Sequence, residues 1–445
     1  MQLNLDIPAE IMEVLDELRR AGGEVLLVGG VVRDALLGHR FRDFDVATSL
    51  RPDAIELVLP GVRAEFGAAS ATIATAGGEV ELTVTTFRID GEYTDQRHPS
   101  SVTFVDSVAE DASRRDFTVN AIYADPWTGE LTDPCGGVAD VASRRLEMIG
   151  APEERLREDP LRILRAVRFA ACLEFTFAPS TEQALRLLAP ETDALTRERV
   201  FDELSNAFTG PGRGRALQLL VELGIADHVL PEVLAMPGVE QPEEYHPEGD
   251  VFVHTCLVLD HAVEGDLVQA WAAVLHDVGK PATFERAADR IRFNGHDTLS
   301  ADMADVILRR FNVSKELREE VVEVCRDHIR FAALPDMLPK RRERWMRSPW
   351  FESHLKFHRA DCLGSHAKLG IYEFAKEHWL ALTPEPPPPL CTGADVLALG
   401  LSEGPSIGEA LRRLDELVTK DDVSDRDTAL SMLREIVESH FRGRT

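Results

Sequence analysis

The chain has 445 residues but only six cysteines, and no two of them form a C-x-x-C pair. The six are Cys135, Cys172, Cys256, Cys325, Cys362 and Cys391. Because these cysteines are scattered and lack a C-x-x-C pair, we interpret them as reduced thiols of a cytoplasmic protein, and neither a disulfide framework nor a zinc site is expected. No apolar run approaches the length of a membrane span, and residues 1–10 carry no basic and apolar signal region, so no membrane partner is expected.

Positive charge is also scarce. Lysine and arginine number 49 against 77 aspartates and glutamates, which gives a formal net charge of −28. Nucleic-acid-binding proteins usually carry a basic footprint, so the overall charge argues against an RNA partner. Residues 155–168 and 340–347 are locally basic, however, and an RNA would have to bind such a local positive stripe. The length suits two to four domains.

The most informative stretch is residues 25–48, where an apolar strand leads into a glycine pair, a short amphipathic helix and the sequence DFDVAT. In a strand, Asp43 and Asp45 share one face while Phe44 and Val46 share the other. Two carboxylates on one face repel each other unless a cation lies between them. Mg²⁺ prefers one or two carboxylates together with phosphate oxygens, so the pair indicates a nucleoside-triphosphate site.

Residues beside the aspartate pair support this interpretation. Gly30 follows another glycine at the start of the helix, where phosphate groups can approach backbone N–H groups. Arg33 is the nearest cation, and Glu81, in the strand predicted for residues 80–87, is either a third carboxylate or a solvated strand residue. Most isolated D-x-D pairs are solvated strand ends, but the combination with the glycine pair and Arg33 favours a metal and triphosphate site.

The sequence GGVVRDALLG followed by DFDVATS resembles the first motif of class II tRNA nucleotidyltransferases and bacterial poly(A) polymerases, which have a polymerase-β-like head. Residues 114–123, RRDFTVNAIY, match the second motif of that family. The resemblance implies that Arg115 contacts the triphosphate and that Asp116 and Asn120 hold a ribose or the local loop. Residues 88–102 are predicted to form a loop, and similar loops occur in family members that add a terminal adenosine. Residues 125–137 resemble the third motif.

Residues 158–168 are predicted to open a helix at Glu158, with Asp159, Arg162 and Arg165 on one face. They resemble the EDxxR motif, in which the aspartate and arginine recognise the incoming base. A carboxylate that accepts from an amino group, beside a guanidinium that donates to a ring nitrogen, fits cytosine and adenine but not uracil or guanine. Arg165 and Arg168 are better placed for phosphates. The alternative is an i,i+3 ion pair that only stabilises the helix.

A second group of residues resembles the HD superfamily of metal-dependent phosphohydrolases. The residues that match its ligand order are His254, His276, Asp277, His296, His328 and Asp361, with His254 predicted to begin a helix. Histidine and carboxylate ligands suit a divalent transition metal. The resemblance implies that His254, the HD pair and Asp361 hold one metal ion and that the two remaining histidines hold a second. The alternative is a retained fold with an idle or structural site.

These resemblances imply an α+β fold. The nucleotidyltransferase head with a small mixed sheet is expected in residues 1–150, and a helical neck with the base-recognition helix in residues 151–235. A helical HD domain is expected in residues 245–375, and a helical tail in residues 390–445, after a proline-rich spacer at residues 384–389.

The function predicted from these motifs is template-independent addition or repair of the 3′-terminal CCA of tRNA, with CTP and ATP as substrates and Mg²⁺ in the head. Asp43 and Asp45 would carry a two-metal-ion transfer, and the HD site would add a phosphohydrolase activity. Three alternatives remain open at this stage. They are an A-adding enzyme or poly(A) polymerase, an HD phosphohydrolase with a nucleotide-binding head, and a non-catalytic RNA-binding protein, which the charge and the complete carboxylate sets disfavour.

Overall fold

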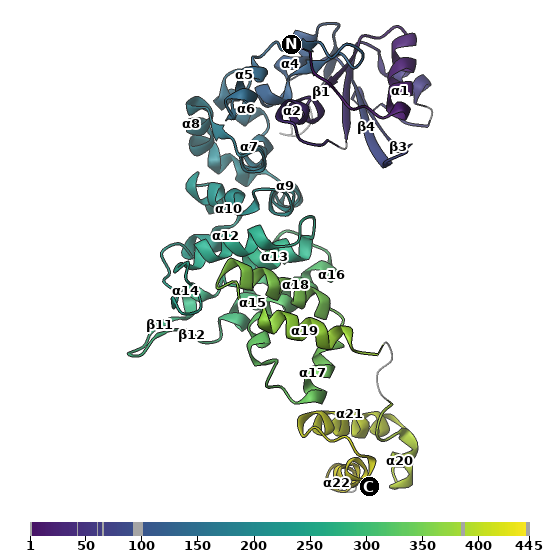
Figure 1. The fold of residues 1–445 in the computed structure, drawn as a ribbon, viewed down its shortest axis with the longest axis vertical. Coiled ribbons are helices and arrows are strands. Elements are labelled where there is room, and N and C mark those ends of the chain that lie inside the picture. The colour runs from purple at the N-terminus through teal and green to yellow at the C-terminus, as the bar shows by residue number, and fades with distance from the viewer. Residues whose placement is uncertain are drawn as a thin grey trace. The chain divides into compact units, whose positions relative to one another are not determined.

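The computed structural model describes residues 2–41, 43–59, 61–64, 66–91, 101–383 and 388–441. The chain folds into two compact units (Figure 1). The first extends to Ala235 and includes Arg310–Asn312, and the second comprises Met236–Arg309 and the residues from Val313 onward. A mixed sheet in the first unit and a predominance of helices elsewhere confirm the predicted α+β class. In the part of the chain that is described, no helix combines the length and apolarity needed to cross a bilayer.

The six-stranded sheet of the first unit has the order β3-β4-β2-β1-β7-β8. Only the β2–β4 pair is parallel among its neighbouring strands, so the sheet is mixed as predicted. The strands are β1 (Val25–Val28), β2 (Phe44–Thr48), β3 (Ala68–Thr75), β4 (Gly78–Thr86), β7 (Tyr123–Ala124) and β8 (Leu131–Thr132).

The predicted strand, turn and helix at residues 25–38 are confirmed. Strand β1 is buried along its whole length, and helix α2 (Gly30–Leu37) follows directly after Gly29. Gly29 and Gly38 have φ angles of 76° and 73°, which L side chains rarely adopt, so glycine is needed at both ends of this helix. Helix α1 (Ala9–Arg20) buries one apolar face, as its sequence periodicity predicts.

One helix boundary differs from the prediction. Helix α6 (Pro152–Glu158) ends where a new helix was expected to open, and α7 (Leu161–Cys172) begins three residues later. Asp159, between them, is extended, with φ −143° and ψ 97°. The reason is steric, because the ring of Pro160 disfavours the helical conformation in the residue before it. Helices α8 (Pro179–Leu188), α9 (Arg197–Thr209) and α10 (Arg213–Glu222) follow in the neck.

The predicted loop at residues 88–102 is bordered by paired strands. β5 (Arg88–Asp90) and β6 (Val102–Phe104) form an antiparallel pair, so the expectation of a loop along the whole stretch was wrong at both ends. Residues 92–100 of this loop and residues 384–387 of the proline-rich spacer lie outside the described residues.

The second unit is mainly helical, and its helices α12, α13, α16 and α18 pack against one another. Helix α12 begins at Val251 rather than at His254, because the side chain of Asp250 accepts a hydrogen bond from Val253 N and caps the helix. A short antiparallel hairpin, β11–β12, interrupts the helices. The elements are α12 (Val251–His261), α13 (Leu267–Leu275), α14 (Lys280–Thr283), β11 (Phe284–Arg286), β12 (Ile291–Phe293), α15 (His296–Arg310), α16 (Lys315–Asp327), α17 (Pro339–Met346), α18 (Phe351–Gly364) and α19 (Gly370–Leu380).

The C-terminal tail is helical, as predicted. It consists of α20 (Gly393–Ala398), α21 (Pro405–Lys420) and α22 (Arg426–His440). These helices bury a hydrophobic cluster of their own, which includes Val396, Leu414 and Leu433.

Candidate active sites

The first candidate site is an acidic edge of the head sheet. Phe44 and Val46 are buried in β2, while Asp43 and Asp45 are exposed on the opposite face. In the parallel β2–β4 pair Phe44 lies beside Leu82, so the same register brings Asp43 beside Glu81. The structure therefore gathers three carboxylates on one face and favours the interpretation of Glu81 as the third.

The electrostatics of Asp45 agree with this clustering. The protein around Asp45 displaces water and raises the pKa of its carboxyl group above the ordinary value. The negative charges of Asp43 and Glu81 raise this pKa further, whereas Arg115 and Arg33 oppose the rise. Mutual repulsion of this kind is what a bound divalent cation relieves, so the edge has the donor set for Mg²⁺.

Gly29 lets the backbone approach this edge closely. A Cβ atom at position 29 would lie 3.2 Å from Oδ2 of Asp45, and its φ of 76° would strain any other residue. Gly30 follows as the first residue of α2, so the N-terminus of that helix lies next to the carboxylates. Backbone N–H groups at a helix N-terminus favour anions, including phosphate.

Arg33, Asn120, Asp116 and Arg165 form one hydrogen-bonded chain that links α2, the 3₁₀ helix Thr118–Asn120 and α7. Arg33 Nη1 donates to Asn120 Oδ1 at 2.7 Å, and Asn120 Nδ2 donates to Asp116 Oδ1 at 3.0 Å. Arg165 Nη2 donates to Asp116 Oδ2 at 2.7 Å. Burial alone would raise the pKa of Asp116, but Arg165 and the hydrogen bonds hold it at about 2. Two predicted site residues, Asp116 and Asn120, thus position two predicted cations.

Arg115 is held differently. Its guanidinium group donates to the carboxylate of Asp111 and to the hydroxyl of Tyr123. Burial alone would raise the pKa of Asp111, but the neighbouring guanidinium groups of Arg115 and Arg114 lower it. Arg115 is therefore fixed and charged, and close enough to Asp45 to lower that residue's pKa.

Three of the predicted nucleotide-binding arginines surround one aromatic ring. The guanidinium carbons of Arg33, Arg165 and Arg168 lie 5.3, 5.2 and 4.4 Å from the ring centroid of Phe169. Cation–π attraction to a single ring helps hold several positive charges in a small volume. Phe169 could not be singled out from the sequence, because an apolar residue in an amphipathic helix ordinarily indicates only core packing.

Asp159 and Arg162 have different partners in this structure. Arg199 Nη2 lies 3.1 Å from Asp159 Oδ1, while Arg162 Nη1 lies 3.0 Å from Glu158 Oε2. Asp159 and Arg162 do not lie on one continuous helix face as expected, because the chain breaks at Asp159. Arg199 was missed, since its place in the first turn of α9 indicated only helix packing.

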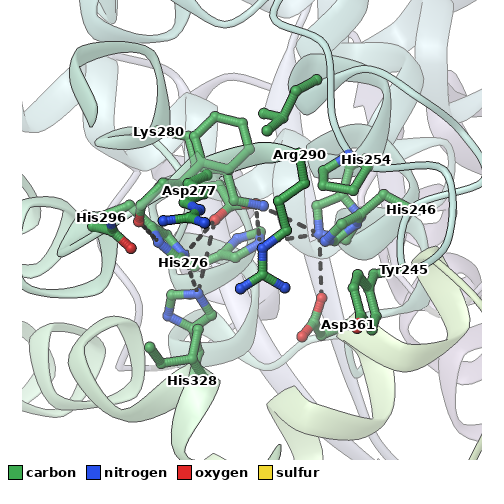
Figure 2. A pocket seen from close by; sticks show the side chains of 16 residues that line it. Tyr245, His246, His254, His276, Asp277, Lys280, Arg290, His296, His328 and Asp361 are labelled. Atoms are coloured by element: carbon green, nitrogen blue, oxygen red, sulfur yellow. Dashed lines mark hydrogen bonds and ion pairs between the residues drawn. The ribbon is translucent and has the colours of Figure 1, made fainter. Parts of the chain in front are cut away.

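The second candidate site lies in the second unit, where side chains that are distant in sequence line one pocket of about 320 Å³ (Figure 2). All six predicted HD ligands line it. They are His254 in α12, His276 and Asp277 directly after α13, His296 at the start of α15, His328 at the start of the 3₁₀ helix His328–Ala333, and Asp361 in α18.

One half of the pocket is formed by His254, His276, Asp277 and Asp361. His254 Nε2 lies 3.2 Å from Asp361 Oδ1 and 3.3 Å from His276 Nε2. His276 Nε2 lies 3.1 Å from Asp277 Oδ2. Nitrogen and oxygen donors that converge so closely are compatible with a single divalent ion.

The other half is formed by His296 and His328 together with the second oxygen of Asp277. Asp277 Oδ1 lies 3.6 Å from His296 Nε2 and 3.8 Å from His328 Nε2, and the two histidine nitrogens are 3.1 Å apart. Asp277 therefore directs one carboxylate oxygen to each half of the pocket.

Backbone carbonyls fix the orientation of three of these rings. The Nδ1 atoms of His276, His296 and His328 lie 2.9, 2.7 and 2.6 Å from the carbonyl oxygens of Ala273, Phe293 and Cys325. An N–H at Nδ1 leaves Nε2 as the free acceptor that faces the pocket. A carbonyl that accepts a hydrogen bond from the ring nitrogen opposite the metal is typical of metal-binding histidines.

The donor set fits a metal on two further grounds. Both carboxylate oxygens of Asp277 are buried, and within the described ranges neither has a hydrogen-bond partner of normal geometry, although Lys280 Nζ lies 2.7 Å from Oδ2. Burial and the neighbouring His276 lower the pKa of His328 to about 3, so this ring is neutral, the form that binds metals.

The polar residues that support this pocket were not predicted from the sequence. Glu248 Oε1 lies 2.8 Å from His254 Nδ1 and 2.9 Å from His246 Nδ1, and Lys280 contacts Gln241 as well as Asp277. Lys280 lies three residues after Asp277, a spacing that places both on one side of a helical turn and could have identified it. Glu248 lies in an acidic connecting segment with no signal that distinguishes it from its neighbours.

Comparisons with known proteins cover the segment that contains the first site. Residues 25–147 match the family model of the poly A polymerase head domain, and residues 174–236 match the model described as the probable RNA and SrmB-binding site of polymerase A. The chain is 35% identical over 416 residues to an A-adding tRNA nucleotidyltransferase of Deinococcus radiodurans, with 88% of this chain and 90% of the relative covered.

A second group of relatives consists of CCA-adding enzymes. The enzyme of Geobacillus stearothermophilus is 41% identical over 216 residues, and the alignment spans about half of its length, 53%. A solved structure of the CCA-adding enzyme of Bacillus stearothermophilus in complex with CTP has a TM-score of 0.68 and 26% identity, with 97% of each chain covered. A complex of the Thermotoga maritima CCA-adding enzyme with tRNA has a TM-score of 0.55 at 19% identity and shows a shared fold.

Proposed function

Because the chain belongs to the family of tRNA nucleotidyltransferases, we propose that it completes or repairs the 3′-terminal CCA of tRNA with CTP and ATP. The observation that carries this proposal is the acidic edge formed by Asp43, Asp45 and Glu81 beside the N-terminus of α2. Asp43 and Asp45 would hold Mg²⁺, which would neutralise the triphosphate and activate the 3′ hydroxyl of the RNA. The phosphorus atom gains the RNA oxygen and releases pyrophosphate, while the hydroxyl proton passes to solvent.

The arginines around Phe169 would donate hydrogen bonds to the triphosphate, and each is also paired with a carboxylate of the fold. Arg33 and Arg165 are held by Asn120 and Asp116, so their positions are set before a nucleotide binds. Catalysis of this kind depends on positioning and electrostatic stabilisation, which fixed side chains provide without reorganisation.

The RNA must bind a body with a net charge of −28. Several arginines of the first basic stretch, including Arg155, Arg165 and Arg168, are paired with carboxylates within the fold. In the second basic stretch, Arg341 of helix α17 is exposed, while the neighbouring Arg344 pairs with Asp415 at 2.9 Å. We therefore propose α17 as one local positive surface for the phosphate backbone of the RNA.

The nucleotide set is tested with three forms of tRNA, which end before CCA, after CC, or after the complete CCA. Purified protein with Mg²⁺ receives CTP and ATP singly and together, and the products are resolved at single-nucleotide length. We expect CCA to be added to the shortest tRNA, followed by a stop. Incorporation into none of the three would contradict transfer, and continued adenylation of the complete tRNA would indicate a poly(A) polymerase.

Addition of adenosine alone is the second candidate function. It is favoured by the relative from Deinococcus radiodurans, because that similarity extends over 88% of this chain. In this case only the tRNA that ends in CC would be extended, with ATP and not with CTP. The same assay therefore separates the two candidates.

Replacement of Asp159 by alanine tests base recognition. If the Asp159 carboxylate accepts from the amino group of cytosine and adenine, kcat/KM for CTP and ATP should fall about 100-fold. The corresponding values for UTP and GTP should change far less, since neither base offers that amino donor. Glu153→Gln, which alters an exposed carboxylate of neighbouring α6, is the matched control. A parallel fall for all four nucleotides would assign Asp159 a structural role through Arg199.

The pocket of the second unit supports a further activity, hydrolysis of a phosphoester. His254, His276, Asp277, His296, His328 and Asp361 would hold a divalent transition metal or a pair of such ions. Bound there, the metal would supply Lewis acidity and lower the pKa of a water molecule. In the overall reaction the phosphorus atom gains the water oxygen, the P–O ester bond breaks, and the alcohol leaves with a proton. Asp277 orients both halves of the site, and buried Lys280 balances its charge.

A further inference from the structure

The hairpin β11–β12 is attached directly to the histidine and aspartate pocket. The carbonyl oxygen of Phe293, the last residue of β12, lies 2.7 Å from Nδ1 of His296. Lys280 Nζ lies 5.4 Å from the ring centroid of Phe293. The base of the hairpin is therefore fixed by the same side chains that form the pocket, and residues near its turn have a defined position relative to the candidate metal ligands.

Arg290 projects from the turn of this hairpin toward the pocket. The turn is closed by a hydrogen bond from Ala287 N to Arg290 O at 3.1 Å, and Arg290 immediately precedes β12. Its side chain is exposed to solvent and also lines the pocket. Figure 2 shows the guanidinium group pointing into the space in front of the histidines and Asp361.

Arg290 forms no close ion pair among the described residues, unlike its neighbours, although its charge helps to lower the pKa of the adjacent Asp289. Arg286 pairs with Glu240, Arg292 pairs with Asp289, and Lys280 pairs with Asp277. Across the residues that the structure describes, no carboxylate lies within ion-pair distance of the Arg290 side chain, although two aspartates line the same pocket. A guanidinium group in this position has its hydrogen-bond donors free for an anionic ligand.

We infer that Arg290 binds the phosphate oxygens of the phosphoester that this pocket takes. The inference rests on the phosphohydrolase activity proposed above and names a substrate-binding residue for it. A planar guanidinium group can donate two parallel hydrogen bonds to two oxygens of one phosphate, and it remains charged at any physiological pH. Because Arg290 is not one of the candidate metal ligands, its contribution is to substrate affinity rather than to metal binding.

The test uses the full-length protein loaded with Mn²⁺. Inorganic phosphate, the product of phosphomonoester hydrolysis, is titrated into it by calorimetry, and the hydrolysis of p-nitrophenyl phosphate is measured in parallel. Arg290→Ala should weaken phosphate binding about 10- to 100-fold and raise KM by a similar factor, with a smaller change in kcat. Arg290→Lys should retain part of the affinity. Metal content, measured by mass spectrometry of the dialysed protein, should equal that of the wild type.

Arg286→Ala is the matched control, because it removes an arginine from the same hairpin that pairs with Glu240 and does not line the pocket. Equal phosphate affinity in the two alanine variants and the wild type would overturn the inference, as would loss of metal from Arg290→Ala or no phosphate binding by the wild type. Phosphate binding that depends on Arg290 without any hydrolysis would support the inference while contradicting the phosphohydrolase. Hydrolysis that does not depend on Arg290 would support the phosphohydrolase activity and contradict the inference about Arg290.

Discussion

Asp45→Asn is expected to lower the rate of nucleotide addition to tRNA by about 10³-fold or more. The substitution keeps the size of the side chain but removes one of the negative charges that would hold Mg²⁺ at the acidic edge. Loss of a metal-binding carboxylate removes several kcal/mol of transition-state stabilisation, and about 1.4 kcal/mol corresponds to a tenfold change in rate. Single-turnover incorporation of labelled CTP and ATP at saturating tRNA measures the effect on the transfer step itself.

Substitution of the other two carboxylates of the edge should lower the rate of nucleotide addition to different extents. Asp43→Asn should resemble Asp45→Asn, whereas Glu81→Gln should cost less, about tenfold, if it only adjusts the local field around the Asp pair. Glu79→Gln is the control, because it removes an exposed carboxylate from the same strand, two residues before Glu81. Equal losses for Glu79→Gln and Asp45→Asn would point to a general effect of charge and contradict a specific metal site. Near wild-type transfer by Asp45→Asn would remove the basis of the proposed function.

Much of the head could be predicted because its signals are local. The alternation of Phe44 and Val46 with Asp43 and Asp45 encodes one buried and one exposed strand face, which the structure shows. The positive φ angles of Gly29 and Gly38 mark the two ends of α2, a conformation that favours glycine. In such segments the residue types and their spacing are sufficient to specify the element.

The convergence of the histidines and aspartates in the second unit was predicted from motif order, whereas the residues that support them were not. Glu248 contacts His254, and Arg199 contacts Asp159. No periodicity in the sequence predicts either contact. The same limit applies to Arg290, whose position depends on a hairpin with strands of only three residues. Such short strands carry too little alternation to be identified without their partner.

The break in the helix before α7 was predicted wrongly for a different reason. Pro160 was expected within the first turn of a helix that began at Glu158. That expectation took into account only the missing N–H of proline, which costs nothing in a first turn. The steric effect of its ring on Asp159 decides the outcome, and the extended conformation of Asp159 lets its side chain meet Arg199 instead of continuing the face of Arg162. The local geometry of the candidate base-recognition residues therefore follows from one proline.

Asp277→Asn is expected to empty the second site of metal completely. Asp277 directs Oδ2 toward His276 and Oδ1 toward His296 and His328, so its charge serves both halves of the pocket. Metal affinity of the variant should fall at least about 100-fold, and phosphoester hydrolysis should fall with it. The measurement is metal content per chain after dialysis against a buffer with a fixed concentration of free Mn²⁺, combined with the rate of p-nitrophenyl phosphate hydrolysis.

A comparison with His328→Gln makes the Asp277 experiment decisive about the number of ions. His328 faces only Oδ1 of Asp277, so its loss should remove one ion from a two-metal site and leave the other, whereas Asp277→Asn should remove both. Nucleotide addition to tRNA should be unchanged in both variants, because the acidic edge of the head contains neither residue. If Asp277→Asn retained the metal content of the wild type, Lys280 rather than a metal would be the natural partner of this carboxylate, and the pocket would be a structural ion-pair cluster.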